Sequence, residues 1–176
     1  YLIKRDPKSA EKAVISFSRY LRGNMDSITQ KAPIPFTEEL EHTKNYCDIE
    51  LLRFGDKLNI VYNTPVTNFS LPALSVQPIV ENAIKHGVTK KPDGGTVTVT
   101  TSEDERNFII KVQDDGVGFD VQNPDLKPGE THAHIGVNNV RERLANMVNA
   151  EFIIESQIDI GTLVTITIPK KEVESV

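Results

Sequence analysis

The chain has 176 residues, of which 26% are charged and 38% hydrophobic, and its formal net charge is -5 at pH 7. This length accommodates one domain of ordinary size with a smaller appendage, and the acidic balance disfavours nucleic acid as a partner. No apolar run approaches the roughly 20 residues that a membrane-spanning helix needs. The single cysteine, Cys47, excludes an internal disulfide and a cysteine-rich zinc site, and we interpret it as a small core residue.

Two amphipathic helices are predicted at the start of the chain. Asp6 followed by Pro7 is typical of a helix start, and apolar residues then recur at helical spacing until about Gly23. After a link that contains two prolines, a second helix begins with Thr37 as a potential cap and ends at Gly55. Three glutamates favour the positive end of its dipole: Glu38, Glu39 and Glu41. Because two helices alone bury little surface, we expect this hairpin to pack on the rest of the chain, on a partner chain, or on both.

Strands dominate the remainder of the chain. An alternating run at 58–62 predicts a half-buried strand, and runs at 96–101 and 107–112 predict a hairpin around a charged tip. Two more strands are expected at 151–155 and 162–168, with a helix before them. Since most strands come in hairpin pairs, we expect an α+β fold. This is a two-layer α/β sandwich with a mixed, mostly antiparallel sheet and helices on one face, preceded by the helical hairpin.

Residues 77–87 predict a helix with two chemically different faces. One face is apolar, whereas the other gathers a carboxylate, an amide, an ammonium and an imidazole: Glu81, Asn82, Lys85 and His86. A solvated helix face is the ordinary interpretation of such a stripe. Asn82 does not fit that interpretation well, because asparagine is a mediocre helix former with no structural reason to lie in mid-helix.

An acidic pair runs into two alternate glycines at 114–118, directly after the predicted strand at 107–112. Such glycines permit tight turning and the close approach of a flat or phosphorylated ligand. The alternative is a simple hairpin turn, because Asp-Gly between strands is a strong turn signal. A calcium loop at 114–125 is disfavoured, since the acid spacing is wrong and no glutamate closes the loop.

The stretch from Asp120 to His134 has no apolar period and is interpreted as a mobile lid. A helix is predicted to begin after it at Gly136, with Arg141 and Arg143 beside its apolar positions. Backbone N–H groups at a helix N-terminus, with an arginine near, can bind an anion such as phosphate. Alternatively, the glycine only permits the turn into the helix and the arginines are solvated.

Three motifs therefore occur in order, with a smaller fourth: Glu81-Asn82-Ala83-x-Lys85-His86, Asp114-x-Gly116-x-Gly118, Gly136-Val137-x-Asn139 and Gly161-Thr162. Their order resembles the Bergerat-type ATP-binding domain shared by histidine kinases, gyrase-type ATPases and the Hsp90 family. The residues at 77–87 and 139–144, together with 18–22 upstream, are similar to the LytS/YehU class of sensor histidine kinases. This resemblance covers nearly the whole chain.

The resemblance implies a role for each motif residue. Asn82 would help to hold Mg²⁺ against the ATP phosphates, and Asp114 would accept a hydrogen bond from the adenine amino group. The implied catalytic positions are Asn82, Lys85 and Glu81. The other implied nucleotide-binding positions are Gly116, Gly118, His86, Gly136, Asn139, Arg143 and Thr162.

The same resemblance implies a domain organisation and a function. Residues 1–55 would be a dimerisation and coupling segment, and residues 56–176 would be the ATP-binding catalytic domain. A protein of this class transfers the γ-phosphoryl of ATP to a histidine and then to a response regulator, and it acts as a homodimer. The chain would be the cytoplasmic portion of a membrane-anchored bacterial sensor, reaching the membrane only through regions outside this sequence.

Two departures from the wider superfamily bear on the reaction. Hydrolysing ATPases place a glutamate four residues before the magnesium asparagine, and Pro78 occupies that position here, which favours transfer over hydrolysis. None of the four histidines, including His42, has the Pro-His-Phe context of the acceptor, so the acceptor is expected just before Tyr1. A nucleotide-driven ATPase clamp and a non-catalytic nucleotide-sensing module are the alternative functions.

Overall fold

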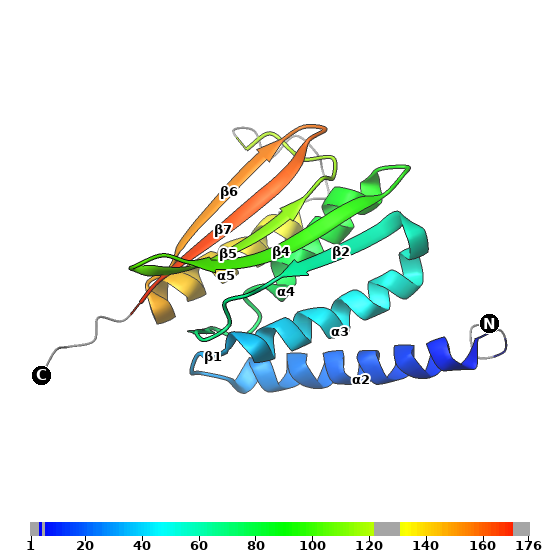
Figure 1. The fold of residues 1–176 in the computed structure, drawn as a ribbon, viewed down its shortest axis with the longest axis horizontal. Coiled ribbons are helices and arrows are strands. Elements are labelled where there is room, and N and C mark those ends of the chain that lie inside the picture. Colours follow the sequence, from blue (N-terminus) through cyan, green and yellow to red (C-terminus); the bar gives the residue numbers. More distant parts are fainter. Residues whose placement is uncertain (1–3, 5, 122–130, 171–176) are drawn as a thin grey trace, which may run out of the picture.

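The computed structural model describes residue 4, residues 6–121 and residues 131–170. Five strands form one sheet: β2 (Leu58–Asn63), β4 (Gly95–Glu103), β5 (Asn107–Asp114), β6 (Glu151–Gln157) and β7 (Gly161–Pro169). They lie in the order β2-β4-β5-β7-β6, as Figure 1 shows. Strand β2 runs parallel to β4, and all other neighbours are antiparallel. The predicted mixed, mostly antiparallel sheet is therefore confirmed.

Helices cover one face of this sheet (Figure 1). They are α3 (Phe36–Phe54), α4 (Gln77–Asn82) with the π-helical turn η2 (Ala83–Gly87), and α5 (Thr131–Val148). The inward-facing side chains of the two central strands are buried: Val97, Val99, Ile110 and Val112. Their outward-facing neighbours, such as Thr98 and Lys111, are not buried, because successive side chains of a strand point to opposite faces. The two-layer α/β sandwich is thus confirmed.

Helix α2 (Pro7–Thr29) packs on α3 and completes the predicted hairpin (Figure 1). Asp6 caps it by accepting hydrogen bonds from the Ser9 N–H at 3.1 Å and the Ser9 hydroxyl at 2.6 Å. The prediction that this helix ends near Gly23 is wrong. Gly23 lies inside the helix because the His42 ring of α3 packs against it, and a Cβ at position 23 would stand 2.6 Å from that ring.

The start of α3 also differs from the prediction. The helix begins at Phe36 without a side-chain cap, so the expected cap by Thr37 is wrong. The preceding residues form a short strand, β1 (Ile34–Pro35), which pairs with β3 (Ser70–Leu71), and the Phe36 N–H donates to the Phe69 carbonyl at 2.9 Å. These long-range backbone bonds fix the entry to α3 and leave no need for a local cap.

One buried cluster joins the helical hairpin to the sheet. Phe36 is fully buried and stacks on Phe69 with ring centroids 4.7 Å apart. Cys47 is buried in the same cluster, as predicted, together with Leu58 of β2 and Val99 of β4. Helix α3 therefore contributes directly to the core under the sheet.

Helix α5 begins at Thr131, before the predicted start at Gly136, and that prediction is wrong. Residues 131–135 contain neither proline nor glycine, so nothing in their composition stops the helix. The predicted lid at 120–134 falls largely on residues 122–130, which lie outside the described residues. Within the described parts of the chain, no helix is long and apolar enough to cross a membrane.

Candidate nucleotide-binding site

Strand β5 ends at Asp114, whose carboxyl group is the buried acceptor of the site. The residue is only 5% exposed, and its Oδ1 accepts a hydrogen bond from the Gly116 N–H at 2.9 Å. Burial raises the pKa of Asp114 to about 6, because the hydrogen bonds from Gly116 and Thr162 offset only part of the desolvation. A carboxylate held in this way has free acceptor capacity for one further N–H donor.

Three glycines from separate parts of the chain surround Asp114. A Cβ on Gly87 would stand 2.6 Å from Asp114 Oδ1, and a Cβ on Gly116 would stand 2.7 Å from the same atom. A Cβ on Gly161 would overlap the Asp114 backbone oxygen. Only glycine fits at these contacts, so the end of η2 and the loop after β5 meet at the Asp114 carboxylate, and the start of β7 meets the backbone of the same residue.

Asp115 has a different environment from its neighbour. It is exposed, its Oδ1 accepts a hydrogen bond from the Thr96 N–H at 2.7 Å, and its backbone oxygen accepts from Lys91 Nζ at 2.7 Å. Asp115 therefore ties the loop to the start of β4. The assignment of the adenine contact to Asp114 stays a prediction.

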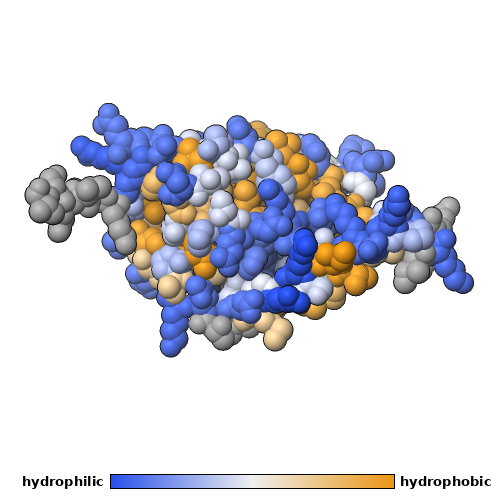
Figure 2. Space-filling model, turned by 60° about the horizontal axis from the view of Figure 1, so that its bottom comes forward, coloured by the Kyte–Doolittle hydropathy of each residue, from blue (hydrophilic) through white to orange (hydrophobic). Residues whose placement is uncertain are grey.

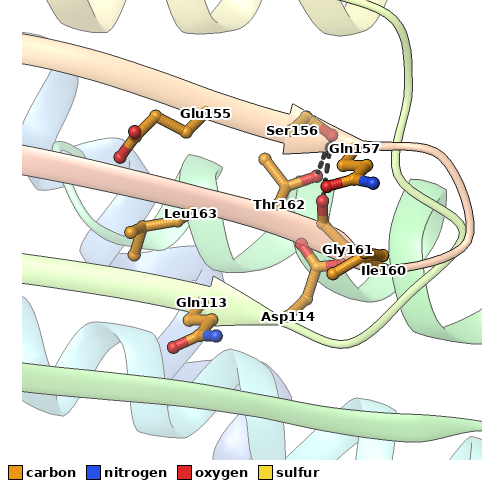
Figure 3. Close-up of a pocket in the computed structure, with 9 residues that line it drawn as sticks. All are labelled: Gln113, Asp114, Glu155, Ser156, Gln157, Ile160, Gly161, Thr162 and Leu163. Atoms are coloured by element: carbon orange, nitrogen blue, oxygen red, sulfur yellow. Dashed lines mark hydrogen bonds between the residues drawn. The ribbon is translucent and has the colours of Figure 1, made fainter.

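A hollow of about 250 Å³ opens beside Asp114 (Figure 3). It is lined by Gln113, Asp114, Glu155, Ser156, Gln157, Ile160, Gly161, Thr162 and Leu163. The Ser156 and Thr162 hydroxyls lie 3.0 Å apart, and Ser156 Oγ also accepts from the Phe119 N–H at 2.9 Å. Sequence reasoning missed Ser156. Ser156 is identified by its position opposite Thr162 in the β6–β7 hairpin.

The helix that carries Asn82 presents its two faces as predicted. Its apolar face is buried: Ile79, Val80, Ala83 and Ile84. On the other face, Lys85 Nζ is paired with Glu81 Oε1, Asn82 is half-buried and His86 is exposed. The helix changes from α to π at Ala83, a change of winding that is common at functional sites. The structure thus brings the end of this helical segment to Asp114 through Gly87.

The third motif is arranged differently from the prediction. Gly136 lies within α5, so it offers no free helix N-terminus, and a Cβ at that position would meet nothing within 4 Å. Asn139 is exposed on the same helix. A role of these two residues in phosphate binding stays a prediction.

Arg143 makes a structural contact in the folded chain, and its role as a phosphate contact stays a prediction. Its Nη2 donates to the Leu74 carbonyl oxygen at 2.5 Å, and the side chain is half-buried between α5 and the segment before α4. Desolvation lowers the pKa of Arg143, and the nearby Glu39 opposes this shift. The guanidinium is therefore engaged in a structural contact, which sequence periodicity alone could not reveal.

Glu39 lies in the first turn of α3 as predicted, but sequence reasoning missed its buried partners. It is fully buried on α3 and accepts three backbone N–H bonds, from Leu74 at 2.8 Å, Val76 at 2.8 Å and Gln77 at 3.1 Å. The prediction paired Glu39 with the dipole of its own helix. A signal was available, since Glu39 lies one turn after Phe36 and beside Leu40 on the buried stripe of α3.

Solved structures show which class of fold this is. The kinase domain of a blue-light activated histidine kinase from Erythrobacter litoralis matches with a TM-score of 0.58 and 18% identity, covering 92% of this chain and 75% of that one. The Acinetobacter baumannii histidine kinase AdeS matches with a TM-score of 0.60 and 13% identity, covering 97% and 80%. The fold is that of a histidine kinase catalytic domain.

Sequence comparison identifies the family. Residues 72–172 match the family described as Histidine kinase-, DNA gyrase B-, and HSP90-like ATPase, and residues 1–58 match the family described as Histidine kinase. The first match covers more than half of the chain, and the chain belongs to this ATPase family.

Three relatives match more than nine-tenths of the chain, and two of them, YpdA and LytS, carry sensor names. YwpD from Bacillus subtilis is 34% identical over 166 residues, which cover 93% of this chain and 60% of that protein. Sensor histidine kinase YpdA from Escherichia coli is 33% identical over 96% of this chain and 30% of its own length. Sensor protein LytS from Enterococcus faecalis is 28% identical over 98% of this chain and 31% of its own length. The resemblance to the LytS class is confirmed, and the chain spans 30% to 60% of these relatives.

Proposed function

We propose that the chain is the ATP-binding catalytic part of a sensor histidine kinase. It would transfer the γ-phosphoryl of ATP to a histidine outside this sequence, and a response regulator would then receive the phosphoryl group. The observation that carries the proposal is the contact between the Asp114 carboxylate and Gly87, at the end of the segment that carries Asn82. This contact assembles an adenine acceptor and a phosphate-side amide in a chain of the ATPase family.

The adenine end of the nucleotide would bind at Asp114. Its free acceptor capacity suits the exocyclic amino group of adenine, and Thr162 supports the carboxyl group from β7. Gly116 and Gly118 would shape the loop beside the base, because the backbones of Gly87 and Gln157 pack where their side chains would stand, and Gly118 has a φ of 57°, which glycine adopts without strain. His86 would lie beside the nucleoside.

The phosphate end would bind at Asn82 with Mg²⁺. Among the described residues, no group of three or more His, Cys, Asp or Glu side chains could hold a metal ion. A single amide oxygen fits Mg²⁺ nevertheless, because this ion keeps water ligands and takes others from phosphates. Bound Mg²⁺ would neutralise charge on the phosphates. Lys85, which is paired with Glu81 in the structure, would turn toward a phosphate when nucleotide binds.

The residue at position 78 favours transfer over hydrolysis. Pro78 lies in the first turn of α4, where it fits a helix start but offers no group that could accept a proton from water. Because no base at this place activates water, the γ-phosphoryl group would be transferred to a protein nucleophile instead. Histidine is the nucleophile that the proposal assigns.

The helical hairpin would serve dimerisation in the full-length protein. Helix α2 exposes apolar side chains at spacings of three and four residues, namely Val14, Phe17, Leu21 and Met25, of which Met25 is 69% exposed. Apolar patches lie among polar ones on the face that Figure 2 brings forward. A second copy of the chain would cover α2, and anchoring to a bacterial membrane would come from regions outside this sequence. Sedimentation of the wild-type protein and of a Leu21→Glu variant tests this dimer contact. The variant is expected to sediment as a monomer.

Transfer in trans tests the kinase proposal. The chain is mixed with Mg-ATP and a longer chain that carries the acceptor histidine and the substitution Asn82→Ala. An acid-labile phosphohistidine on the longer chain is the expected product. Steady release of phosphate without any partner would instead support an ATPase clamp. Binding of Mg-ATP without transfer, even in the full-length protein, would support a nucleotide-sensing module.

A further inference from the structure

Leu74 occupies a strained turn that is held from both sides. Its φ is 56°, in the left-handed region that a leucine rarely adopts. The Leu74 N–H donates to Glu39 Oε2 at 2.8 Å, and the Leu74 carbonyl accepts from Arg143 Nη2 at 2.5 Å. The Glu39 carboxylate of α3 therefore binds the N–H of Leu74, and the Arg143 guanidinium of α5 binds its carbonyl oxygen.

The other oxygen of Glu39 lies at the start of α4. Oε1 accepts from the Val76 N–H at 2.8 Å and from the Gln77 N–H at 3.1 Å, and these are the N-cap and first residues of the helix. The first N–H groups of a helix have no partner within it, and a negative charge there also stabilises the helix dipole. Glu39 thus does for α4 what a local capping residue does elsewhere, but from a different helix.

Asn82 stands at the far end of the same short helix. Helix α4 runs only from Gln77 to Asn82, so a shift of its first turn moves Asn82 with it. The adenine side is held separately, because Asp114 is fixed by the β5 strand and the Gly116 N–H. Asn82 is closer than Gly87 along the chain to the turn that Glu39 holds, so the bonds of Glu39 bear more on the phosphate side of the site than on the adenine side.

We propose that Glu39 is a positioning residue for phosphoryl transfer: with Arg143 it fixes the turn at Leu74 and so sets where Asn82 meets the phosphates. This inference rests on the proposed function. It also identifies a physical link between the helical hairpin and the site, since a displacement of α3 carries Glu39 with it. Helix α2 reaches the same junction, where the Gln77 side chain donates to Asn24 at 3.5 Å.

Comparison of adenosine with Mg-ATP binding tests this inference. Titration calorimetry is done on wild-type chain, Glu39→Gln, Asn82→Ala and the double variant. Glu39→Gln is expected to weaken Mg-ATP binding by about tenfold and to leave adenosine binding within about twofold, because the phosphate side shifts more than the adenine side. In the Asn82→Ala background the same substitution is expected to cause no further loss, since Glu39 acts through Asn82.

Controls separate positioning from folding. Glu41→Gln removes an exposed charge from the same helix and is expected to change neither affinity. Glu39→Asp keeps the charge and is expected to restore part of the Mg-ATP affinity. If Glu39→Gln does not fold, Arg143→Lys perturbs the other side of Leu74 and is expected to show the same split. Hydrogen exchange at the Leu74, Val76 and Gln77 amides is expected to accelerate in both variants.

The positioning role of Glu39 and the proposed function can be overturned by different outcomes. Equal losses for adenosine and Mg-ATP, or a loss that adds to that of Asn82→Ala, would make Glu39 a structural residue only and leave the proposed function standing. A wild-type chain that does not bind Mg-ATP at all would overturn the proposed function, and the positioning role with it.

Discussion

The Asp114 carboxylate lies against the Cα of Gly87, where a Cβ would stand 2.6 Å from Oδ1. The substitution Gly87→Ala should therefore displace either the carboxylate or the end of η2. We expect adenosine binding to weaken by about tenfold or more, while the circular dichroism spectrum stays that of the folded protein. Lys90→Ala, in the exposed turn that follows, is the matched control. Unchanged binding in Gly87→Ala would show that the contact does not shape the site.

Asp114 and Asp115 should differ when each is replaced by asparagine. Asp114→Asn removes the charge that would accept the adenine amino group, so ATP affinity should fall strongly while the fold persists. Asp115→Asn keeps an oxygen that can accept from the Thr96 N–H, so it should affect binding much less. Calorimetric titration of both variants with ATP checks the difference. Equal losses would contradict the assignment of the adenine contact to Asp114.

Stability and binding should depend on pH in opposite directions through Asp114. Burial raises the pKa of this group to about 6 in the folded chain, above its ordinary 3.8. The group therefore favours the folded state fully below about pH 4, and that stabilisation is lost as the pH rises through 6. Near pH 7 the ionised group costs on the order of 3 kcal/mol relative to its unfolded state. Nucleotide binding, which uses the ionised form, should weaken as the pH falls below 6.

Thermal unfolding of wild-type chain and Asp114→Asn between pH 4 and 7.5 measures this dependence. The asparagine variant does not titrate at this position, so its stability relative to wild type should increase as the pH rises. An advantage that is constant across this range would mean that the Asp114 carboxyl has an ordinary pKa.

Phe36→Ala should unfold the helical hairpin and the sheet together. Phe36 is fully buried and stacks on Phe69, which in turn stacks on Phe108 of β5 at 5.0 Å. Loss of this side chain should cost about 3–5 kcal/mol. Because α3 and the sheet share one core, urea unfolding followed by helical and aromatic signals should give a single coincident transition. Two separated transitions would show that the hairpin unfolds independently.

The parts of the fold that depend on local pattern could be predicted from the sequence. Alternation identified the strands around Val97 and Ile110, and helical spacing identified the buried face of the Asn82 helix. The failures involve partners that are distant along the chain. Gly23 suggested a helix end, but it lies in mid-helix because a ring from α3 packs on it. The parallel pairing of β2 with β4 was likewise not specified, since no turn sets it.

The same difference between local patterns and distant partners applies to the candidate site. Asp114 and its flanking glycines could be proposed from the sequence as a ligand loop, because the spacing within one loop carries that information. Gly87 lies at the end of the predicted Asn82 helix, but its contact with Asp114 was not predicted. The buried partners of Glu39 and Arg143 were not predicted, because each bonds to Leu74, which is 35 and 69 positions away in the chain. Charged residues on a helix are ordinarily solvated, and only the folded structure shows which of them find buried partners.

The π-helical winding from Ala83 to Gly87 makes the length of this segment as important as its composition. In an α-helix each residue advances the direction of the side chain by about 100°. Deletion of one residue between Asn82 and Gly87 could restore ordinary winding without a break in the helix. Because a π-helical turn holds about one residue more than an α-helical turn, Gly87 would keep its direction toward Asp114 after this deletion. An insertion that ordinary helical winding must absorb would instead turn position 87 by about 100° and bring a bulkier neighbour to the Asp114 carboxylate, so an added residue should be tolerated by the fold and should abolish nucleotide binding.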